Sequence, residues 1–464
     1  MIKPLLLIAT AAAAILASPA LAQNQDLGTP IAEGGEVETV DEGEGLTGSV
    51  SFEGNLDDLG IAIPAFAADR DVPTPANSAG TAALGRELAK VITADLRNNG
   101  LFKPTGPESL PQPSYGEITA PNWTTWSNRG AEMLVHGYVR ARSDGKLTIG
   151  CYLYDMALQQ RLVAEGWAVG PADWRRAAHK CADLVYSRLS GESPFFDSRV
   201  AYIAETGPKD KRVKRLAIMD SDGANHRFIT NGRSTALTPR YSPDYRKLSY
   251  LSYVDGNPRI YVYDIGTGTQ TLVTQSANPT FAPRWSPDGR YILYSMAVAG
   301  NTDIYRVPAS GGASVRLTST PGIDIGGSYS PDGTKIVFES DRSGGQQCYV
   351  MDADGSNQRR ISFGGGRCAT PEWSPRGDQI AFTNASSFNI AVMTPAGGNV
   401  RTLTRGWQDE APTWAPNGRI IQFFRTERGT GRTSLWQVDL TGENERRLET
   451  PRDASDPAWG PILP

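Results

Sequence analysis

The sequence predicts a small α/β domain followed by an all-β, six-bladed β-propeller that is closed by the C-terminal strand. Two short patterns recur with one period in the second part of the chain, and an incomplete copy stands at each end of the array. After Glu192 the chain consists of predicted strands and turns. We therefore expect four parts: a signal peptide (1–22), an acidic lead and arm (23–59), the α/β domain (60–191) and the propeller (192–464).

The first 22 residues have the pattern of a cleaved secretory signal peptide. Lys3 precedes an apolar run over residues 5–17, and Ala20-Leu21-Ala22 forms a small-x-small cleavage site. The alternative is a membrane anchor, but the run is short for the ~30 Å hydrocarbon core of a bilayer. We expect cleavage after Ala22 and export to the periplasm without direct membrane insertion.

Residues 23–69 contain no Lys or Arg, and ten acidic side chains lie between Asp26 and Asp58. The part up to Gly45 has few large apolar side chains, so we expect it to be disordered. The next stretch, 46–58, resembles an extended arm. Its composition alone favours a solvated linker.

The α/β domain is predicted from the spacing of its apolar residues. Leucine and valine at helical spacing, each run closing at a glycine, predict two long helices, and shorter apolar runs predict strands of a mixed sheet. The expected strands cover residues 61–66, 133–141, 146–155 and 161–169, and the expected helices cover 80–99 and 173–191.

The propeller is predicted from its repeats. A Ser-Pro turn or its equivalent, preceded by Trp or Tyr, recurs in steps of 44, 44, 44, 41 and 45 residues, and a second pattern recurs in steps of 44, 44, 44, 42 and 45. One supersecondary unit is therefore copied six times, and a period near 44 fits the four strands of a propeller blade. In Ser-Pro-Asp-Gly, glycine accepts the positive φ of the turn, so Tyr245 in the first copy predicts a strained or different turn.

The ends of the array predict how the ring closes. The first copy, at 198–205, lacks a Ser-Pro strand of its own, and the last such strand, at 456–461, has no strands after it. The two fragments together make one blade, which removes both exposed edges. A solenoid would need polar caps instead.

Catalytic and cofactor motifs are absent from the sequence. There is no Gly-x-Ser-x-Gly nucleophile turn, no phosphate-binding loop and no HExxH pattern among three histidines, so we expect no enzyme and no cofactor. Asp-x-Asp-Gly segments at 220–223 and 352–355 fall at hairpin turns and lack the Glu of a calcium loop. The net charge of −4 gives no reason to expect nucleic-acid binding.

These absences favour a binding function at the mouth of the ring. The residues that precede each Trp/Tyr-Ser-Pro pattern should face this mouth. They are Pro279, Phe281, Ala282, Asp324, Ile325, Gly326, Thr370, Asp409, Glu410 and Asp456. For Ala282 and Gly326 taken singly, a role in shaping the loop is the stronger interpretation.

Four cysteines in an exported protein meet an oxidising compartment. Pairing within each half, Cys151 with Cys181 and Cys348 with Cys368, is our candidate disulfide arrangement. Free or buried thiols are an equally good interpretation, and both stay open at this point.

The order of parts resembles the TolB family of the Tol-Pal cell-envelope system. The segments that carry the resemblance are IAIPAF, ITADLRNNGLFKP, FFDSRVAYIAE, and the run from RWSPDGRYILYSM to DPAWGP. The resemblance implies a non-catalytic, monomeric periplasmic protein. It also implies docking of the peptidoglycan-associated lipoprotein Pal at the propeller mouth.

The same resemblance implies that the arm binds the inner-membrane protein TolA. The candidate arm residues are Leu46, Val50, Phe52, Asp57 and Asp58. Outer-membrane integrity and envelope constriction at cell division are the implied roles. The acidic extension 23–45 and the four cysteines depart from the family pattern. An exported peptidase remnant and a peptidoglycan-binding scaffold are the alternatives.

Overall fold

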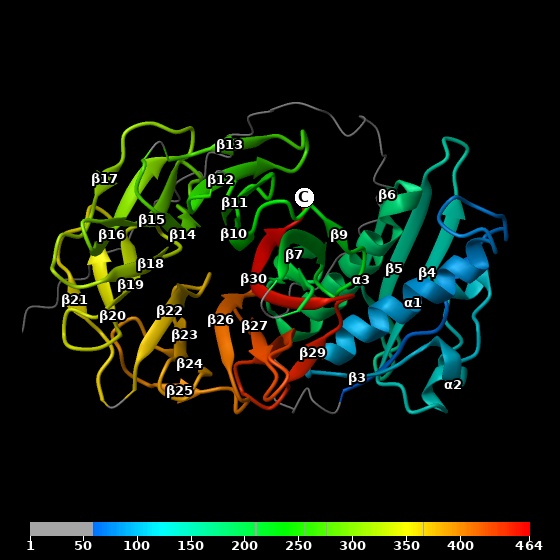
Figure 1. Cartoon of the computed structure of the whole chain (residues 1–464). Coiled ribbons are helices and arrows are strands. Elements are labelled where there is room, and N and C mark those ends of the chain that lie inside the picture. Colours follow the sequence, from blue (N-terminus) through cyan, green and yellow to red (C-terminus); the bar gives the residue numbers. More distant parts are fainter. Residues whose placement is uncertain (1–58, 209–210, 255, 275, 365) are drawn as a thin grey trace, which may run out of the picture. The chain divides into compact units, whose positions relative to one another are not determined.

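The computed structural model describes residues 59–464 apart from 209–210, 255, 275 and 365 (Figure 1). The expected signal peptide, acidic lead and arm therefore lie outside the described residues. Among the helices that are described, none has the length and apolar character needed to cross a bilayer.

The α/β part contains one mixed sheet and two long helices. Its strands are β1 (Gly60–Ala62), β2 (Ala67–Ala68), β3 (Lys103–Thr105), β4 (Met133–Ala141), β5 (Leu147–Asp155) and β6 (Gln160–Val169). Its α-helices are α1 (Thr81–Asn98), α2 (Trp123–Ser127) and α3 (Trp174–Ser190), and short 3₁₀ turns span Pro107–Ser109, Tyr115–Ile118 and Pro171–Asp173. The sheet order is β3-β1-β4-β5-β6, with β1 parallel to both neighbours and β4, β5 and β6 antiparallel.

The strand expected over 61–66 ends earlier than the sequence suggested. Strand β1 stops at Ala62, because Pro64 has no N–H to donate and the N–H of Phe66 donates to the carbonyl of Gly85 on α1, at 3.1 Å. This close approach requires glycine, since a Cβ at Gly85 would lie 2.1 Å from the carbonyl oxygen of Phe66. Helix α1 is thereby held directly against the chain that follows β1.

Helix α3 ends as predicted at Gly191, whose φ of 71° is the left-handed conformation that terminates many helices. A disulfide between Cys151 on β5 and Cys181 on α3 joins the helix to the sheet. A second disulfide, Cys348–Cys368, joins two neighbouring propeller blades. Both disulfides join the cysteines that the sequence analysis gave as candidate pairs.

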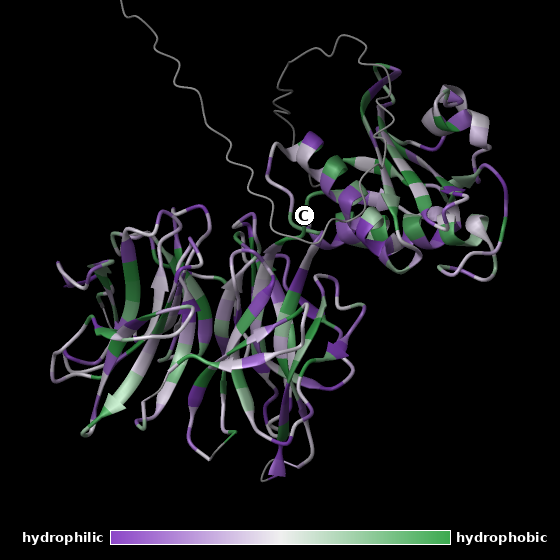
Figure 2. Cartoon of the chain, turned by 90° about the horizontal axis from the view of Figure 1, so that it is seen from above, coloured by the Kyte–Doolittle hydropathy of each residue, from purple (hydrophilic) through white to green (hydrophobic). Residues whose placement is uncertain are grey.

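Six four-stranded sheets form the ring of the propeller (Figure 1). Blade 1 comprises β10 (Ala236–Tyr241), β11 (Lys247–Ser252), β12 (Arg259–Asp264) and β13 (Gln270–Leu272). Blade 2 comprises β14 (Thr280–Trp285), β15 (Tyr291–Val298), β16 (Asn301–Pro308) and β17 (Val315–Arg316). Blade 3 comprises β18 (Asp324–Tyr329), β19 (Lys335–Ser340), β20 (Gln347–Asp352) and β21 (Arg359–Arg360). Blade 4 comprises β22 (Cys368–Trp373), β23 (Ile380–Asn384), β24 (Asn389–Met393) and β25 (Arg401–Thr402). Blade 5 comprises β26 (Asp409–Trp414), β27 (Ile420–Thr426), β28 (Thr433–Asp439) and β29 (Arg446–Leu448). Hydrophobic residues are concentrated along the strands, as Figure 2 shows, because the faces of neighbouring blades pack on each other.

Blade 6 closes the ring in the predicted way. Its strands are β30 (Asp453–Ile462), β7 (Ser198–Thr206), β8 (Val213–Asp220) and β9 (Arg227–Phe228), so the last strand of the chain pairs with the first strand of the propeller. Trp459 on β30 is 8% exposed, and its indole N–H donates to the Ser198 hydroxyl on β7 at 2.8 Å. The C-terminal strand is thus an integral part of the core.

Each inner strand contains a bulge that the sequence analysis did not foresee. One residue at this position has φ between 46 and 67° in every blade, and the strand register shifts there. The six residues are Thr238, Ala282, Gly326, Thr370, Ala411 and Asp456. A proline follows in five of the six, so the residue after the left-handed one has no N–H that would need a partner in the ladder.

The turns after the inner strands follow the predicted chemistry. In three of them the Ser hydroxyl donates to the Asp carboxylate two residues later, at 2.5 Å. Tyr245 has φ 53° where the next two copies have Gly289 and Gly333. The turn is therefore strained rather than different, since a left-handed non-glycine residue costs roughly 1–2 kcal/mol.

Candidate binding surface at the propeller mouth

The propeller has two faces because the strands of each blade alternate in direction. One face, here called the turn face, carries the Ser-Pro turns and the turns between the third and fourth strands. The other face, here called the mouth face, carries the starts of the inner strands, the loops between the second and third strands, and the connections between blades. The predicted mouth residues belong to the second face.

The α/β part contacts the turn face of blades 4 to 6. Glu192 pairs with Arg376 at 2.6 Å and with Arg419, and the Asn417 side chain donates to the Tyr186 hydroxyl at 3.2 Å. Arg176 on α3 donates to the carbonyl oxygen of Pro464, at 2.8 Å. These contacts involve the turn face and not the loops of the mouth face.

Most of the predicted mouth residues lie at the entrance of the ring. Pro279 and Thr370 are exposed, and six others are partly exposed on the inner strands. The six are Phe281, Ala282, Ile325, Gly326, Glu410 and Asp456. They come from blades 2, 3, 5 and 6, which the ring brings together around one opening.

Two predicted residues are placed elsewhere. Asp324 and Asp409 are both 0% exposed. Asp324 pairs with Arg342 at 2.8 Å, and Asp409 pairs with Arg425 at 2.5 Å. A buried carboxylate needs such a partner, so these side chains hold their blades together and we leave them out of the proposed binding surface.

The exposed hydrophobic side chains are concentrated on the mouth face. Of the 11 large hydrophobic residues that are exposed in the described chain, six lie on its loops. They are Tyr253, Val254, Val298, Ile323, Phe363 and Trp407. Trp407 is 53% exposed and Phe363 is 69% exposed. Exposed apolar side chains grouped on one face are typical of a surface that binds another protein.

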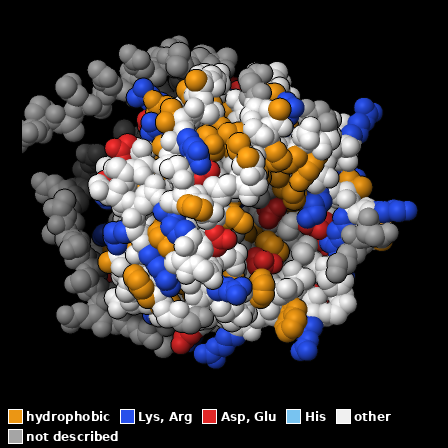
Figure 3. All heavy atoms as spheres, turned by 60° about the vertical axis from the view of Figure 1, so that its left-hand side comes forward, with side chains coloured by type: hydrophobic (Ala, Val, Ile, Leu, Met, Phe, Trp, Pro, Cys, Tyr) orange, Lys and Arg blue, Asp and Glu red, His pale blue; other side chains and the backbone are white. Residues whose placement is uncertain are grey.

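The same loops carry a strong excess of positive charge. Their exposed cations are Lys211, Arg233, Arg367, Arg405, Arg428, Arg432 and Arg452, whereas Glu427 and Glu449 are the exposed acids among the described residues of these loops. Arg428 stacks on Trp407, with its guanidinium carbon 4.6 Å from the ring centre. Figure 3 shows hydrophobic side chains and cations gathered around a hollow that contains acidic side chains.

Three carboxyl groups lie inside the entrance. Burial is the main cause that raises the pKa of Glu339, Glu410 and Asp456 above the ordinary values of these groups. The neighbouring carboxylates of Asp456 and Asp409 raise the pKa of Glu410 further. The mouth therefore has an acidic interior and a basic, apolar rim.

The hydrophobic rim residues were missed in the sequence because they stand in loops. A usable signal exists: Ile323, Phe363 and Trp407 are large apolar residues next to glycine or proline, a few residues before an inner strand. Loops otherwise favour polar residues, so large apolar side chains in the connection before the inner strand of three repeats indicate an exposed surface.

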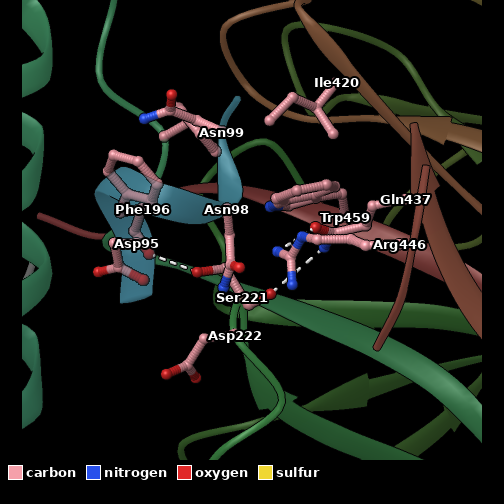
Figure 4. Close-up of a pocket in the computed structure, with 11 residues that line it drawn as sticks. Asp95, Asn98, Asn99, Phe196, Ser221, Asp222, Ile420, Gln437, Arg446 and Trp459 are labelled. Atoms are coloured by element: carbon pink, nitrogen blue, oxygen red, sulfur yellow. Dashed lines mark hydrogen bonds between the residues drawn. The ribbon is translucent and has the colours of Figure 1, made fainter. Parts of the chain in front are cut away.

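A second cluster of charged groups lies where α3 meets the turn face. His179 on α3 is 1% exposed, and its Nδ1 lies 2.7 Å from Asp95 Oδ2 on α1. Its Nε2 lies 4.0 Å from Asp222 Oδ2, in the turn after β8, and Arg175 also pairs with Asp222. Figure 4 shows the small pocket beside this cluster, with Asp95 on one side and Arg446 and Trp459 of the propeller on the other.

This cluster fits a protonated histidine better than a metal ion. Burial alone would lower the pKa of His179, but the Asp95 carboxylate, with Asp222 and Asp220 behind it, raises this pKa to about 9. Donor atoms of Asp95, His179 and Asp222 lie within 4.8 Å of one another, as a metal site would require. However, Arg175 already neutralises Asp222, and a structural zinc site needs four ligands.

The fold and this surface define a six-bladed β-propeller protein with an exposed hydrophobic face at the mouth of its ring. The family model described as the TolB beta propeller domain matches residues 186–463, and that of the TolB amino-terminal domain matches residues 52–162. The chain belongs to the TolB family and is a component of the Tol-Pal system.

Named relatives agree with this assignment. The chain is 75% identical to the Tol-Pal system protein TolB 1 of Novosphingobium aromaticivorans, over 92% of this chain and 95% of that protein. It is 65% identical to TolB of Zymomonas mobilis, over 90% of each. The crystal structure of TolB from Acinetobacter baumannii has a TM-score of 0.75 and 28% identity, over 87% of this chain and 97% of that one.

Proposed function

We propose that the mouth face docks the peptidoglycan-associated lipoprotein Pal in the periplasm and that the arm binds TolA. The protein acts without catalysis, as a protein-binding component that supports outer-membrane integrity and constriction at division. The proposal rests on one observation above all, the grouping of exposed hydrophobic side chains on the mouth face. Aromatic residues and arginine, here Trp407 stacked by Arg428, are the types that contribute most to protein interfaces.

Calorimetric titration of the mature chain with soluble, lipid-free Pal tests the first part. We expect saturable binding, and we expect Ile323→Arg to weaken it by at least about 30-fold, because truncating or blocking an interface anchor costs about 2 kcal/mol or more. Ile323 is 47% exposed, so its side chain can be replaced without opening the core. Trp407→Ala should weaken binding by a similar factor.

The matched control is Val400→Arg. Val400 is 55% exposed but belongs to the turn between β24 and β25, on the turn face. It should bind Pal as tightly as the unchanged chain. Equal losses in both variants, or no heat with the unchanged protein, would refute docking at the mouth.

The arm carries the second part of the proposal. Leu46, Val50, Phe52, Asp57 and Asp58 lie outside the described residues, so their role rests on the family resemblance and on their composition. Four large apolar side chains, Leu46, Val50, Phe52 and Leu56, stand between small, polar and acidic residues. Phe52 is the one aromatic side chain of this segment, so it is the best candidate for an interface anchor.

We expect Phe52→Asp to lower the affinity of the mature chain for the periplasmic part of TolA by about tenfold or more. The control is Phe228→Asp, which removes a 42% exposed phenylalanine from β9 of the propeller. Surface plasmon resonance with immobilised TolA measures both. Unchanged binding of the Phe52 variant would show that the arm is not the TolA site.

Two other functions would give different results. A propeller peptidase remnant would hydrolyse peptides and would lose this activity when one Ser or His is replaced. A glycan-binding scaffold would sediment with purified peptidoglycan in the absence of any lipoprotein. Neither is favoured by a feature of the described residues, whereas the hydrophobic face favours a protein partner.

A further inference from the structure

The basic rim of the mouth face and the acidic N-terminal extension of the same chain have complementary chemistry. The rim loops expose seven Lys and Arg side chains against two acids. The turn face has no such excess, because its Ser-Pro turns expose acids and cations in nearly equal number. The acids are Asp244, Asp288, Asp332 and Asp378, and the cations are Arg246, Lys247, Arg290, Lys335 and Arg376. Positive charge is thus concentrated on the face that also carries the exposed hydrophobic side chains.

The extension has the matching pattern. Residues 26–44 hold seven acids and no Lys or Arg, and the stretch Glu-Val-Glu-Thr-Val-Asp-Glu-Gly-Glu at 36–44 alternates acids with valine. This stretch can offer carboxylates to arginine and small apolar side chains to Trp407 and Phe363. Charge-assisted hydrogen bonds between Arg and carboxylate are among the strong ones in proteins.

The chain is long enough for this contact. The 15 residues from Glu44 to Leu59 span up to about 50 Å when extended, and the 33 residues from position 26 to position 59 span up to about 110 Å. A compact body of about 400 residues has an expected radius of gyration of about 22 Å. The extension can therefore follow the surface of its own molecule to the mouth face.

We infer that the acidic extension, residues 26–44, binds to the mouth surface of its own chain when no partner occupies it. The contact centres on blades 4 and 5, where Arg428 stacks on Trp407 and Arg405 is exposed in the same connection as Trp407. Phe363 and Arg367 are exposed in the connection that leads into blade 4. The extension would then compete with a protein that docks at the mouth. The competition with a docked protein rests on the proposed function, whereas the contact between the extension and the mouth surface does not depend on it.

The test uses the full mature chain and needs no partner protein. In one variant of this chain, the negative charges of residues 36–44 are first removed by five substitutions: Glu36→Gln, Glu38→Gln, Asp41→Asn, Glu42→Gln and Glu44→Gln. A fluorescent peptide of residues 34–46 with the natural sequence is then titrated with this variant, and its anisotropy is measured. We expect saturable binding that weakens as salt is added, and weaker binding of the peptide to the unchanged chain, whose own extension competes.

Replacing rim arginines should locate the contact. Arg405→Ala with Arg428→Ala should weaken peptide binding at least tenfold, whereas Arg359→Ala, which removes an exposed arginine from the start of β21, should leave it unchanged. No binding by the neutralised chain, or equal binding by both arginine variants, would overturn the inference. Because Pal is absent, failure here and failure of Pal docking are separate results.

Discussion

A chain that ends at Arg452 should fail to reach the folded state. It lacks strand β30, which supplies the inner strand of blade 6 and pairs with β7. Without it Ala454, Ala458 and Trp459 are lost from the core, and blades 1 and 5 both face an open edge. Replacing one buried Trp by Ala already costs about 3–5 kcal/mol, against a total stability of about 5–15 kcal/mol.

Circular dichroism in the near ultraviolet and urea titration measure this result. The truncated chain should show no cooperative transition, and Trp459→Ala should show one at a lower urea concentration. Addition of a synthetic peptide of residues 453–464 should restore the cooperative transition, because it supplies the missing strand. A truncated chain that melts like the complete protein would mean that the ring does not depend on its closing strand.

The stability of the protein should fall as the pH rises from about 7 to about 9.5. The pKa of His179 in the folded protein is about 9, above its ordinary value of 6.5. Its protonated form is therefore favoured by folding. The contribution is fully present below about pH 6.5 and is lost as the pH rises through about 9. A shift of this size corresponds to about 3 kcal/mol.

The groups that face His179 fix the sign of this dependence. Asp95, Asp222 and Asp220 favour the imidazolium, and Arg175 binds Asp222 from the other side. Urea unfolding at several pH values measures the effect. In His179→Gln the slope should disappear, and the free energy of unfolding near pH 7 should drop by about 3–5 kcal/mol because Asp95 loses its buried partner.

His136→Gln is the matched control for this experiment. His136 is also a fully buried histidine, but burial lowers its pKa to about 4. It is therefore neutral in the folded protein throughout the alkaline range. Its variant should retain the pH slope of the unchanged protein between about pH 7 and 9.5. Loss of the slope in both variants would show that His179 is not its source.

The repeats made most of the fold predictable. Because the turn pattern and the second pattern keep one period, the number of blades and the closure of the ring follow from counting. The strand over 61–66 was predicted too long because a contact with Gly85, a residue of α1, ends it. Such a contact is invisible to local hydrophobic patterning.

The candidate site was less predictable than the fold. The position before each Ser-Pro turn located the mouth, but it could not separate Glu410, which lines the entrance, from its neighbour Asp409, which Arg425 buries. Successive side chains of a strand point to opposite sides, so Glu410 and Asp409 face different surroundings. The partner that binds Asp409 is Arg425 on the neighbouring strand β27. Asp95, His179 and Asp222 are likewise brought together only by the fold.

The bulge of the inner strand gives blades 3, 4 and 5 the same contact with the blade that precedes each of them. In blades 3, 4 and 5 the N–H of the left-handed residue donates to a side chain on the second strand of the preceding blade: Gly326 to Ser295, Thr370 to Glu339, and Ala411 to Thr383, at 3.1–3.3 Å. A unit of this kind has a donor on one side and an acceptor on the other. Head-to-tail contacts of this kind generate closed rings whenever the rotation per unit divides a full turn. A single ancestral blade, duplicated within one gene, would therefore already have had both the backbone donor and the side-chain acceptor of this contact.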